Sequence, residues 1–223
     1  APVKWDRQIV DSGAGVQAVV VNSGIANACT GEEGMGYCKE TAEAAAKALN
    51  IDVAGVLVGS TGVIGMQLPM QKLVDGIQVL AGKKAEGLQS GHDAALAIMT
   101  TDTVEKEMAV EMEIGGKTVT IGGMSKGSGM IHPNMCTMLA FITTDAAITK
   151  EALQKALSED VEDTYNMISV DGDTSTNDTA ILLANGLAGN QEITYASPEY
   201  ETFKEALHMV NETLAKKMAG DGE

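Results

Sequence analysis

The chain has 223 residues, of which 44% are hydrophobic and 21% charged, a composition that allows one large or two small globular domains with a sizeable core. The formal net charge is −16 and no basic cluster stands out, so we expect no nucleic-acid partner, because phosphate contacts require Lys and Arg. No apolar run reaches the roughly 18 residues of a membrane span, so no membrane partner is expected. Three cysteines without metal-ligand spacing favour a reducing, cytoplasmic location and no bound metal.

The first half of the chain alternates segments typical of strands and helices. Apolar, β-branched runs predict buried strands at residues 17–22 and 55–58. Small and polar side chains predict a loop at residues 22–31 and a turn at residues 59–62. Helical spacing predicts three helices, at residues 35–49, 68–80 and 87–99.

The second half begins with an alternating pattern on either side of Gly115 and Gly116, which predicts a hairpin with strands at residues 108–114 and 117–121. The remaining expected elements are a glycine-rich loop at 122–134, a buried strand at 137–143, helices at 150–158 and 161–167, and a polar loop at 171–179. An amphipathic helix is predicted from apolar side chains at three- and four-residue steps: Phe203, Leu207, Val210, Leu214 and Met218. Gly220 is its expected C-cap. Intermixed strands and helices indicate an α/β or α+β fold.

The glycine-rich loop leads directly into Thr137, which opens the predicted strand. Taken alone, a threonine at this place is most simply a β-branched strand residue. Its hydroxyl could also attack the carbonyl of Cys136 and form an ester by an N-to-O shift, which water then hydrolyses. The new α-amine of Thr137, with a reference pKa of about 7.7–8.0, could serve as general base for its own hydroxyl. Cys136 is a rival nucleophile by chemistry.

Residues 126–141, KGSGMIHPNMCTMLAF, resemble the self-cleavage junction of the ornithine acetyltransferase family. The resemblance implies that the bond before Thr137 breaks and that Thr137 then carries the acyl group. Cys136 stands where the family commonly has alanine, which makes Cys136 the carbonyl donor of the cleaved bond rather than the nucleophile.

Residues 60–65 match the family's STGVIG motif, and the resemblance assigns the oxyanion hole to the Thr61 side chain and the Gly62 N–H. Without the resemblance this segment is most simply a strand-to-helix turn. A hydroxyl beside an unencumbered amide suits the stabilisation of a developing oxyanion.

Substrate contacts are implied by three further matches. Residues 99–103 resemble the family's MTTDT motif, which assigns a substrate contact to Thr100. Lys126 matches the family's substrate-binding lysine and suits a substrate carboxylate. Residues 220–223 resemble the start of the DGEGATK motif, in which Glu223 would attract the substrate's amino group.

Two other segments match the family without a fixed role. Residues 171–179, DGDTSTNDT, superficially suggest a calcium loop, but they lack the closing glutamate of an EF-hand. We therefore expect no metal there and interpret the segment as scaffolding beside the site. Residues 22–31 are expected to be structural.

The resemblance implies an α/β/β/α layered fold of the self-processing, N-terminal-threonine acyltransferase type. Cleavage would give an α-chain portion, residues 1–136, and a β-chain portion, residues 137–223, assembled as an α2β2 heterotetramer. Family members carry further stretches at both ends that we expect this chain to lack. The implied reaction is ping-pong transfer of acetyl from N-acetylornithine to glutamate through acetyl-Thr137, without a cofactor, although some members accept acetyl-CoA as co-substrate.

Two other functions remain open from the sequence. A related self-cleaving aminopeptidase or amidase would use water in place of glutamate as acceptor. An inactive, truncated copy would bind amino acids or assemble without processing.

Overall fold

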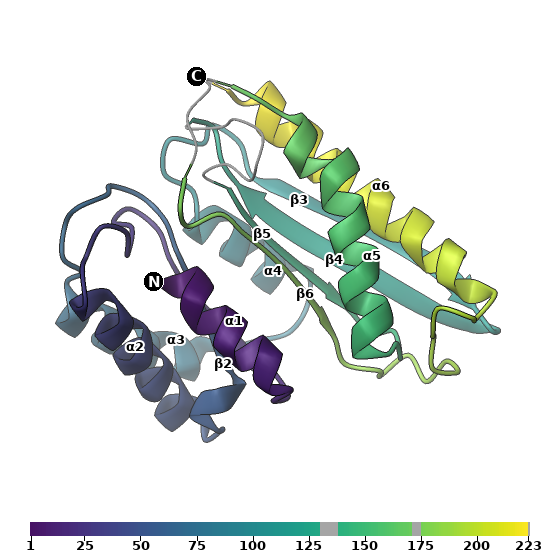
Figure 1. Cartoon of the computed structure of the whole chain (residues 1–223), viewed down its shortest axis with the longest axis horizontal. Coiled ribbons are helices and arrows are strands. Elements are labelled where there is room, and N and C mark those ends of the chain that lie inside the picture. The colour runs from purple at the N-terminus through teal and green to yellow at the C-terminus, as the bar shows by residue number, and fades with distance from the viewer. Residues whose placement is uncertain (130–137, 171–174, 223) are drawn as a thin grey trace. The chain divides into compact units, whose positions relative to one another are not determined.

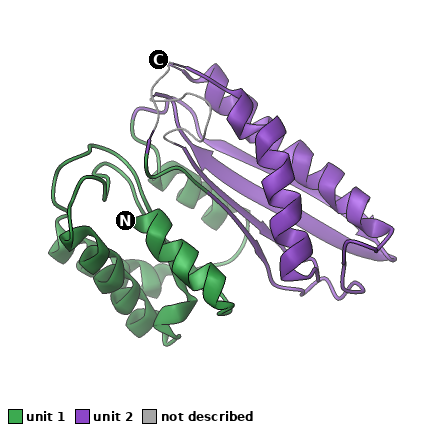
Figure 2. Ribbon diagram, viewed as in Figure 1, with its two compact units in different colours: residues 1–100, 176–179 green, residues 101–175, 180–223 purple. Residues whose placement is uncertain are grey.

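The computed structural model describes residues 1–129, 138–170 and 175–222 and shows a mixed α/β protein, as predicted (Figure 1). The chain forms two compact units, coloured separately in Figure 2. Unit 1 comprises Ala1–Thr100 with Thr176–Thr179, and unit 2 comprises Thr101–Ser175 with Ala180–Glu223.

Unit 1 is built around two parallel strands. Its elements are α1 (Pro2–Ser12), β1 (Ala18–Asn22), α2 (Glu33–Leu49), a 3₁₀ turn (Val53–Gly55), β2 (Val56–Ser60), α3 (Met70–Lys83) and α4 (Leu88–Ala97). β1 and β2 pair in parallel, with Asn22 opposite Ser60 at their carboxyl ends. Buried alanines of α2 form a small core with Val56, Val58 and Ile77. Their small side chains let the helix approach the strands closely.

Unit 2 is a four-stranded sheet with two helices on one face (Figure 1). Its elements are β3 (Lys106–Ile114), β4 (Lys117–Lys126), β5 (Leu139–Thr144), α5 (Lys150–Asp163), a 3₁₀ turn (Tyr165–Met167), β6 (Thr179–Ala184) and α6 (Glu199–Gly220). The strand order is β3-β4-β5-β6, and the β3–β4 and β4–β5 pairs are antiparallel. The predicted apolar stripe of α6 is confirmed, because all five of its side chains are buried in the core of this unit.

The predicted hairpin is also confirmed. β3 and β4 are joined by Gly115 and Gly116, whose φ angles are 58° and 74°. Two consecutive positive φ angles are the geometry of the tight turns that match the twist of paired strands, and glycine adopts them without steric cost.

Residues 122–126, predicted as loop, belong instead to β4. Gly123 pairs with Ile142 of β5 and faces α6, where a Cβ would lie 3.2 Å from Ile142 Cγ1 and 3.3 Å from Val210 Cγ1. Glycine is present here because the helix packs closely on the strand, not because the chain turns.

Other boundaries differ from the sequence prediction as well. The two helices expected at 150–158 and 161–167 are one helix, α5, followed by a 3₁₀ turn. Gly59 and Ser60, expected in a turn, end β2, and α6 runs through Gly220 so that Asp221 takes the C-cap position. Two elements, α1 and β6, were not predicted from the sequence.

Over residues 1–129, 138–170 and 175–222, no helix is long and apolar enough to cross a membrane. The same residues contain no group of three or more His, Cys, Asp or Glu side chains placed to hold a metal ion.

Asp6 is a buried carboxyl group that joins α1 to β2. Its Oδ1 accepts the Val58 N–H at 2.8 Å, whereas its Oδ2 has no hydrogen-bond partner. Burial raises the pKa of Asp6 to about 7, and the hydrogen bond from Val58 only partly opposes this. The folded protein therefore keeps a proton on Asp6 at pH values where the unfolded chain has lost it.

We expect the free energy of unfolding to fall as the pH rises from about 4 to about 7, because over this range the unfolded state releases the Asp6 proton more readily. The contribution is on the order of 4 kcal/mol, fully lost above pH 7. Asp6→Asn keeps the acceptor for Val58 and stays neutral. Burying the new amide costs about 1–3 kcal/mol, which offsets part of the penalty that ionised Asp6 imposes at pH 8. The substitution should therefore raise the free energy of unfolding at pH 8 by about 1–3 kcal/mol.

Urea unfolding at pH 5 and pH 8 checks this expectation, with Asp11→Asn, an exposed substitution on the same helix, as the control. Equal pH dependence of wild type and Asp6→Asn would contradict it.

Candidate functional site

The predicted site residues that the structure describes are divided between the two units. Thr61 and Gly62 follow β2 in unit 1. Thr100 is exposed and is the last residue of the segment Ala1–Thr100 of the same unit. Lys126 is the last residue of β4 in unit 2. Three predicted residues lie outside the described part of the chain: Cys136, Thr137 and Glu223.

The Thr61 loop, residues 60–65, extends the backbone pairing beyond the end of β2. The Thr61 N–H donates to the Asn22 carbonyl at 3.1 Å, and the Thr61 carbonyl accepts from the Gly24 N–H at 3.1 Å. Residues 22–31, expected to be structural, therefore act as a backbone template that fixes the course of the Thr61 loop.

Gly62 is required by this close approach. Its φ is 127°, and a Cβ at this position would lie 2.2 Å from the Gly24 carbonyl carbon and 2.5 Å from the Ile25 nitrogen. The nearby atoms are backbone and cannot move aside as a flexible side chain would. Both the backbone conformation and the space thus exclude any residue with a side chain.

The Thr61 hydroxyl and the Gly62 N–H make no hydrogen bond to any residue in the described part of the chain. Thr61 is only 2% exposed. Both donors therefore remain available to a ligand, because no described residue uses them. Two adjacent donors on a fixed backbone can together stabilise a developing oxyanion.

A buried polar clamp holds the start of the Thr61 loop. The Asn177 side-chain amide donates to the Ser60 carbonyl at 2.9 Å and to the Asn27 carbonyl at 3.4 Å. The Asn27 N–H in turn donates to the Ser60 hydroxyl at 2.9 Å, and the Thr30 hydroxyl donates to Asn27 Oδ1 at 2.7 Å. Asn177 comes from the segment 171–179, so the scaffolding role expected for that segment has a specific contact in its described part.

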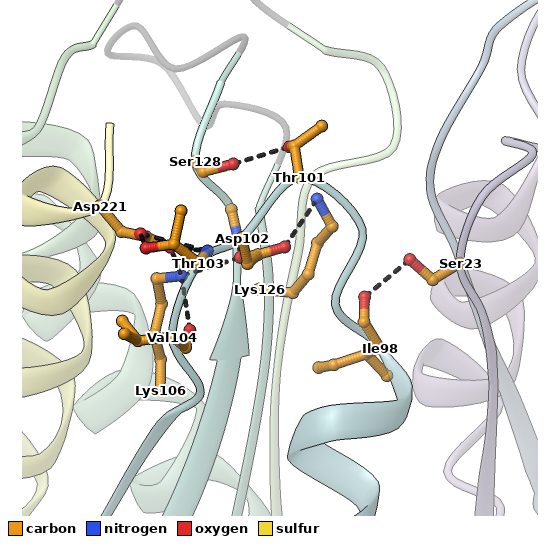
Figure 3. A network of polar contacts seen from close by, with 11 residues as sticks. Ser23, Ile98, Thr101, Asp102, Thr103, Val104, Lys106, Lys126, Ser128 and Asp221 are labelled. Atoms are coloured by element: carbon orange, nitrogen blue, oxygen red, sulfur yellow. Dashed lines mark hydrogen bonds and ion pairs between the residues drawn. The ribbon is translucent and has the colours of Figure 1, made fainter. Parts of the chain in front are cut away.

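The second cluster, the lysine–aspartate network, consists of Asp102, Lys106, Lys126 and Asp221 (Figure 3). Lys106 begins β3 and pairs with Ser125, so the antiparallel register brings Lys106 and Lys126 to the same end of the sheet. All four side chains are at most 6% exposed.

Asp102 bridges the two lysines. Its Oδ1 accepts from Lys106 Nζ at 2.8 Å and from the Gly127 N–H at 2.8 Å, whereas its Oδ2 lies 3.3 Å from Lys126 Nζ. The first residue of the glycine-rich loop is thereby tied to the same carboxylate that faces Lys126. Next to it, the hydroxyls of Thr101 and Ser128 lie 2.7 Å apart.

Asp221 binds the other side of Lys106. Its Oδ2 accepts from Lys106 Nζ at 2.5 Å and from the Thr103 N–H at 3.0 Å, and its Oδ1 accepts from the Thr103 hydroxyl. Burial alone would raise the pKa of Asp221, but the hydrogen bonds from Lys106 and Thr103 outweigh it, so the pKa is lowered and the carboxyl group is ionised.

The two lysines of the network differ in the donors that remain available. Lys106 directs its three N–H groups at Asp102, Asp221 and the Val104 carbonyl, the last at 3.2 Å. In the part of the chain that the structure describes, Lys126 contacts one acceptor, Asp102. An ammonium group has three donors, so Lys126 can bind a further anion and Lys106 cannot.

Sequence reasoning missed Asp102, Lys106 and Asn177 as members of these clusters. Each sits in or near a quoted motif, but the partners of Lys106 and Asn177 are more than a hundred residues away in the chain. Asp221 was missed as well. The family-like segments at 99–103, 171–179 and 220–223 contain Asp102, Asn177 and Asp221 and were the signals that could have suggested these three residues.

Comparison with solved structures finds two similar α/β proteins. It is similar to arginine biosynthesis bifunctional protein ArgJ from Bacillus halodurans, with a TM-score of 0.56 and 44% identity over 62% of this chain and 70% of that one. It is also similar to ornithine acetyltransferase complexed with ornithine from Mycobacterium tuberculosis, with a TM-score of 0.53 and 41% identity over 60% of this chain and 69% of that one.

The ArgJ family matches residues 1–223, and the chain belongs to this family. Arginine biosynthesis bifunctional protein ArgJ of Caldanaerobacter subterraneus subsp. tengcongensis is 52% identical over all of this chain and 55% of its own length. The protein of the same name from Bacillus subtilis is 52% identical over all of this chain and 54% of its own length. The chain thus spans about half the length of the curated relatives it matches.

Proposed function

We propose that the protein is a self-cleaving acetyltransferase that moves an acetyl group from N-acetylornithine to glutamate. The observation that carries this proposal is the pair of unengaged donors, the Thr61 hydroxyl and the Gly62 N–H, on a loop whose backbone is fixed on both sides. Membership of the ArgJ family and similarity to an acetyltransferase that was solved with ornithine supply the substrate class.

Self-cleavage begins when Thr137 Oγ attacks the carbonyl carbon of Cys136. The C–N bond breaks, the amine of Thr137 takes up the hydroxyl proton, and an ester joins the two parts. Water then hydrolyses the ester, leaving a carboxylate on Cys136 and a free amine on Thr137. The tetrahedral intermediate carries a negative oxygen, which we assign to the Thr61 and Gly62 donors.

Acetyl transfer uses the same nucleophile. Thr137 Oγ attacks the acetyl carbonyl of N-acetylornithine, its α-amine accepts the hydroxyl proton, and this proton passes to the leaving ornithine amine. The amine of glutamate then attacks the acetyl ester, giving N-acetylglutamate and the free hydroxyl. Lys126 binds a substrate carboxylate, Thr100 contacts the substrate, and Glu223 attracts its amino group.

The sheet of unit 2 explains how two cleavage products could stay together. β4 precedes the junction and β5 follows it, and six residue pairs join them, from Ile121 with Thr144 to Lys126 with Leu139. Cleavage between Cys136 and Thr137 falls in the connection between these strands and leaves their pairing intact. The products 1–136 and 137–223 would therefore stay associated through this strand pairing, and two such αβ pairs would form the proposed α2β2 assembly.

The face of this sheet opposite α5 and α6 supports the layered α/β/β/α fold. Leu139 and Phe141 alternate with the residues that face the helices, and both are buried. The cover over this part of β5 is what a further layer on that face of the sheet would provide. We further propose a cytoplasmic location and no bound cofactor.

Mass measurement on the intact protein tests the proposal. Two fragments that meet at Cys136 and Thr137 are expected, and incubation with N-acetylornithine alone should add one acetyl group to the second fragment. Glutamate should then remove that group as N-acetylglutamate. Release as acetate in the presence of glutamate would indicate an amidase, and an uncut chain without transfer would indicate an inactive copy.

A further inference from the structure

Lys106 has no place in the chemistry above, yet it is among the largest fully buried side chains. A buried ammonium group costs several kcal/mol unless excellent partners surround it. Asp102, Asp221 and the Val104 carbonyl together accept all three of its N–H groups. Lys106 has no donor left for a ligand, so any contribution to function must pass through its partners.

The partner that leads toward the proposed substrate site is Asp102. Lys106 and the Gly127 N–H both hold its Oδ1, and this fixes the direction in which Oδ2 points. Oδ2 faces Lys126 Nζ at 3.3 Å, a contact long enough to orient the ammonium group without saturating it (Figure 3). The division of the two oxygens between the two lysines is the geometric basis of the inference.

The network balances two lysines against two aspartates. Without Lys106, two buried carboxylates would share the single positive charge of Lys126. Asp102 would then lose one of the two donors that hold its Oδ1, and its carboxylate would turn further toward Lys126 and compete with a bound carboxylate. Lys106 therefore keeps Lys126 available as well as oriented.

We infer that Lys106 is a positioning residue, which holds Asp102 so that Lys126 presents its ammonium group to the carboxylate of an amino-acid substrate. This inference rests on the proposed function, because Lys126 is the substrate-binding group there. Lys106 acts on substrate affinity and not on the acyl-transfer step.

A double-mutant cycle in the intact protein tests the inference, with kcat and KM for N-acetylornithine measured for wild type, Lys106→Met, Lys126→Met and the double variant. Lys106→Met should raise KM about 10-fold or more with kcat changed less than about 3-fold. On the Lys126→Met background the same substitution should change KM by less than about 2-fold. Lys117→Met, at the exposed opposite end of β4, is the matched control and should leave KM unchanged.

Equal effects of Lys106→Met on both backgrounds would overturn the inference, because Lys106 would then act independently of Lys126. If Lys106→Met does not fold, the charge-balanced variant Lys106→Met/Asp221→Asn replaces it; an unchanged KM there would also overturn the inference. A wild type that transfers no acetyl group would overturn the proposed function as well, whereas an active wild type with additive effects overturns only the role of Lys106.

Discussion

Replacing Thr137 with alanine should abolish both backbone cleavage and acetyl transfer. The substitution removes the hydroxyl that attacks the Cys136 carbonyl, so no ester forms and the α-amine that serves as general base is never released. Transfer should fall by at least about 10³-fold, as expected when a nucleophile is removed. Intact mass and a glutamate-dependent transfer assay measure the two effects separately.

Two variants make this result specific. Thr137→Ser keeps both the hydroxyl and the potential α-amine and should still be cut and active, at a reduced rate. Thr143→Ala removes an exposed hydroxyl from β5, the strand that follows the junction, and should behave as wild type. A Thr137→Ala protein that is still cleaved and still transfers acetyl would contradict the proposed mechanism.

The sequence was sufficient for features that depend on local pattern. The spacing of Phe203, Leu207 and Val210 predicted the buried face of α6, and two glycines predicted the β3–β4 hairpin. These features follow from helical periodicity and turn geometry, which neighbouring residues determine. The same local reasoning failed at Gly123. Glycine is needed there because α6, about eighty residues further along the chain, packs closely on the strand.

The lysine–aspartate network shows why the rest of the site was not predictable. On sequence, Lys106 is an ordinary charged residue at the start of a strand and is most simply solvated. Its burial depends on Asp221, which the fold brings from the end of α6. Asn177 likewise reaches the Ser60 carbonyl from a loop that follows α5. Neither the Lys106–Asp221 contact nor the Asn177–Ser60 contact produces a periodic or compositional pattern in the sequence, because the tertiary structure determines both.

The two clusters have different proposed roles: the lysine–aspartate network acts through its charge, and the Thr61 loop acts through the placement of its donors. The lysine–aspartate network can select a charged substrate, because it presents an ammonium group with open donors in a buried setting. The Thr61 loop has no charged side chain, so its contribution depends on where the backbone directs a hydroxyl and an amide. Changes in its backbone should consequently affect rate more than affinity.

Gly62→Ala should lower the rates of cleavage and acetyl transfer more than substitution of Gly65, the other glycine of the Thr61 loop. The new Cβ would meet the backbone of Gly24 at 2.2 Å, so either residues 22–31 or the loop must shift, and the Thr61 hydroxyl and the amide of residue 62 would both be displaced. Loss of one oxyanion donor typically lowers rates by about 10²–10³, and we expect at least this for cleavage and transfer. Because these donors act on the transition state, kcat should fall more than KM rises.

Gly65→Ala is the matched control for this prediction. Gly65 also has a positive φ, 83°, but a Cβ there would meet no atom within 4 Å. It should therefore incur only the conformational cost of a left-handed residue, about 1–2 kcal/mol of stability, with a small effect on rate. Thermal unfolding and the two rate assays on both variants separate general strain from displaced donors. Equal rate losses for the two glycines would show that the loop acts through its flexibility and not through the donors at Thr61 and Gly62.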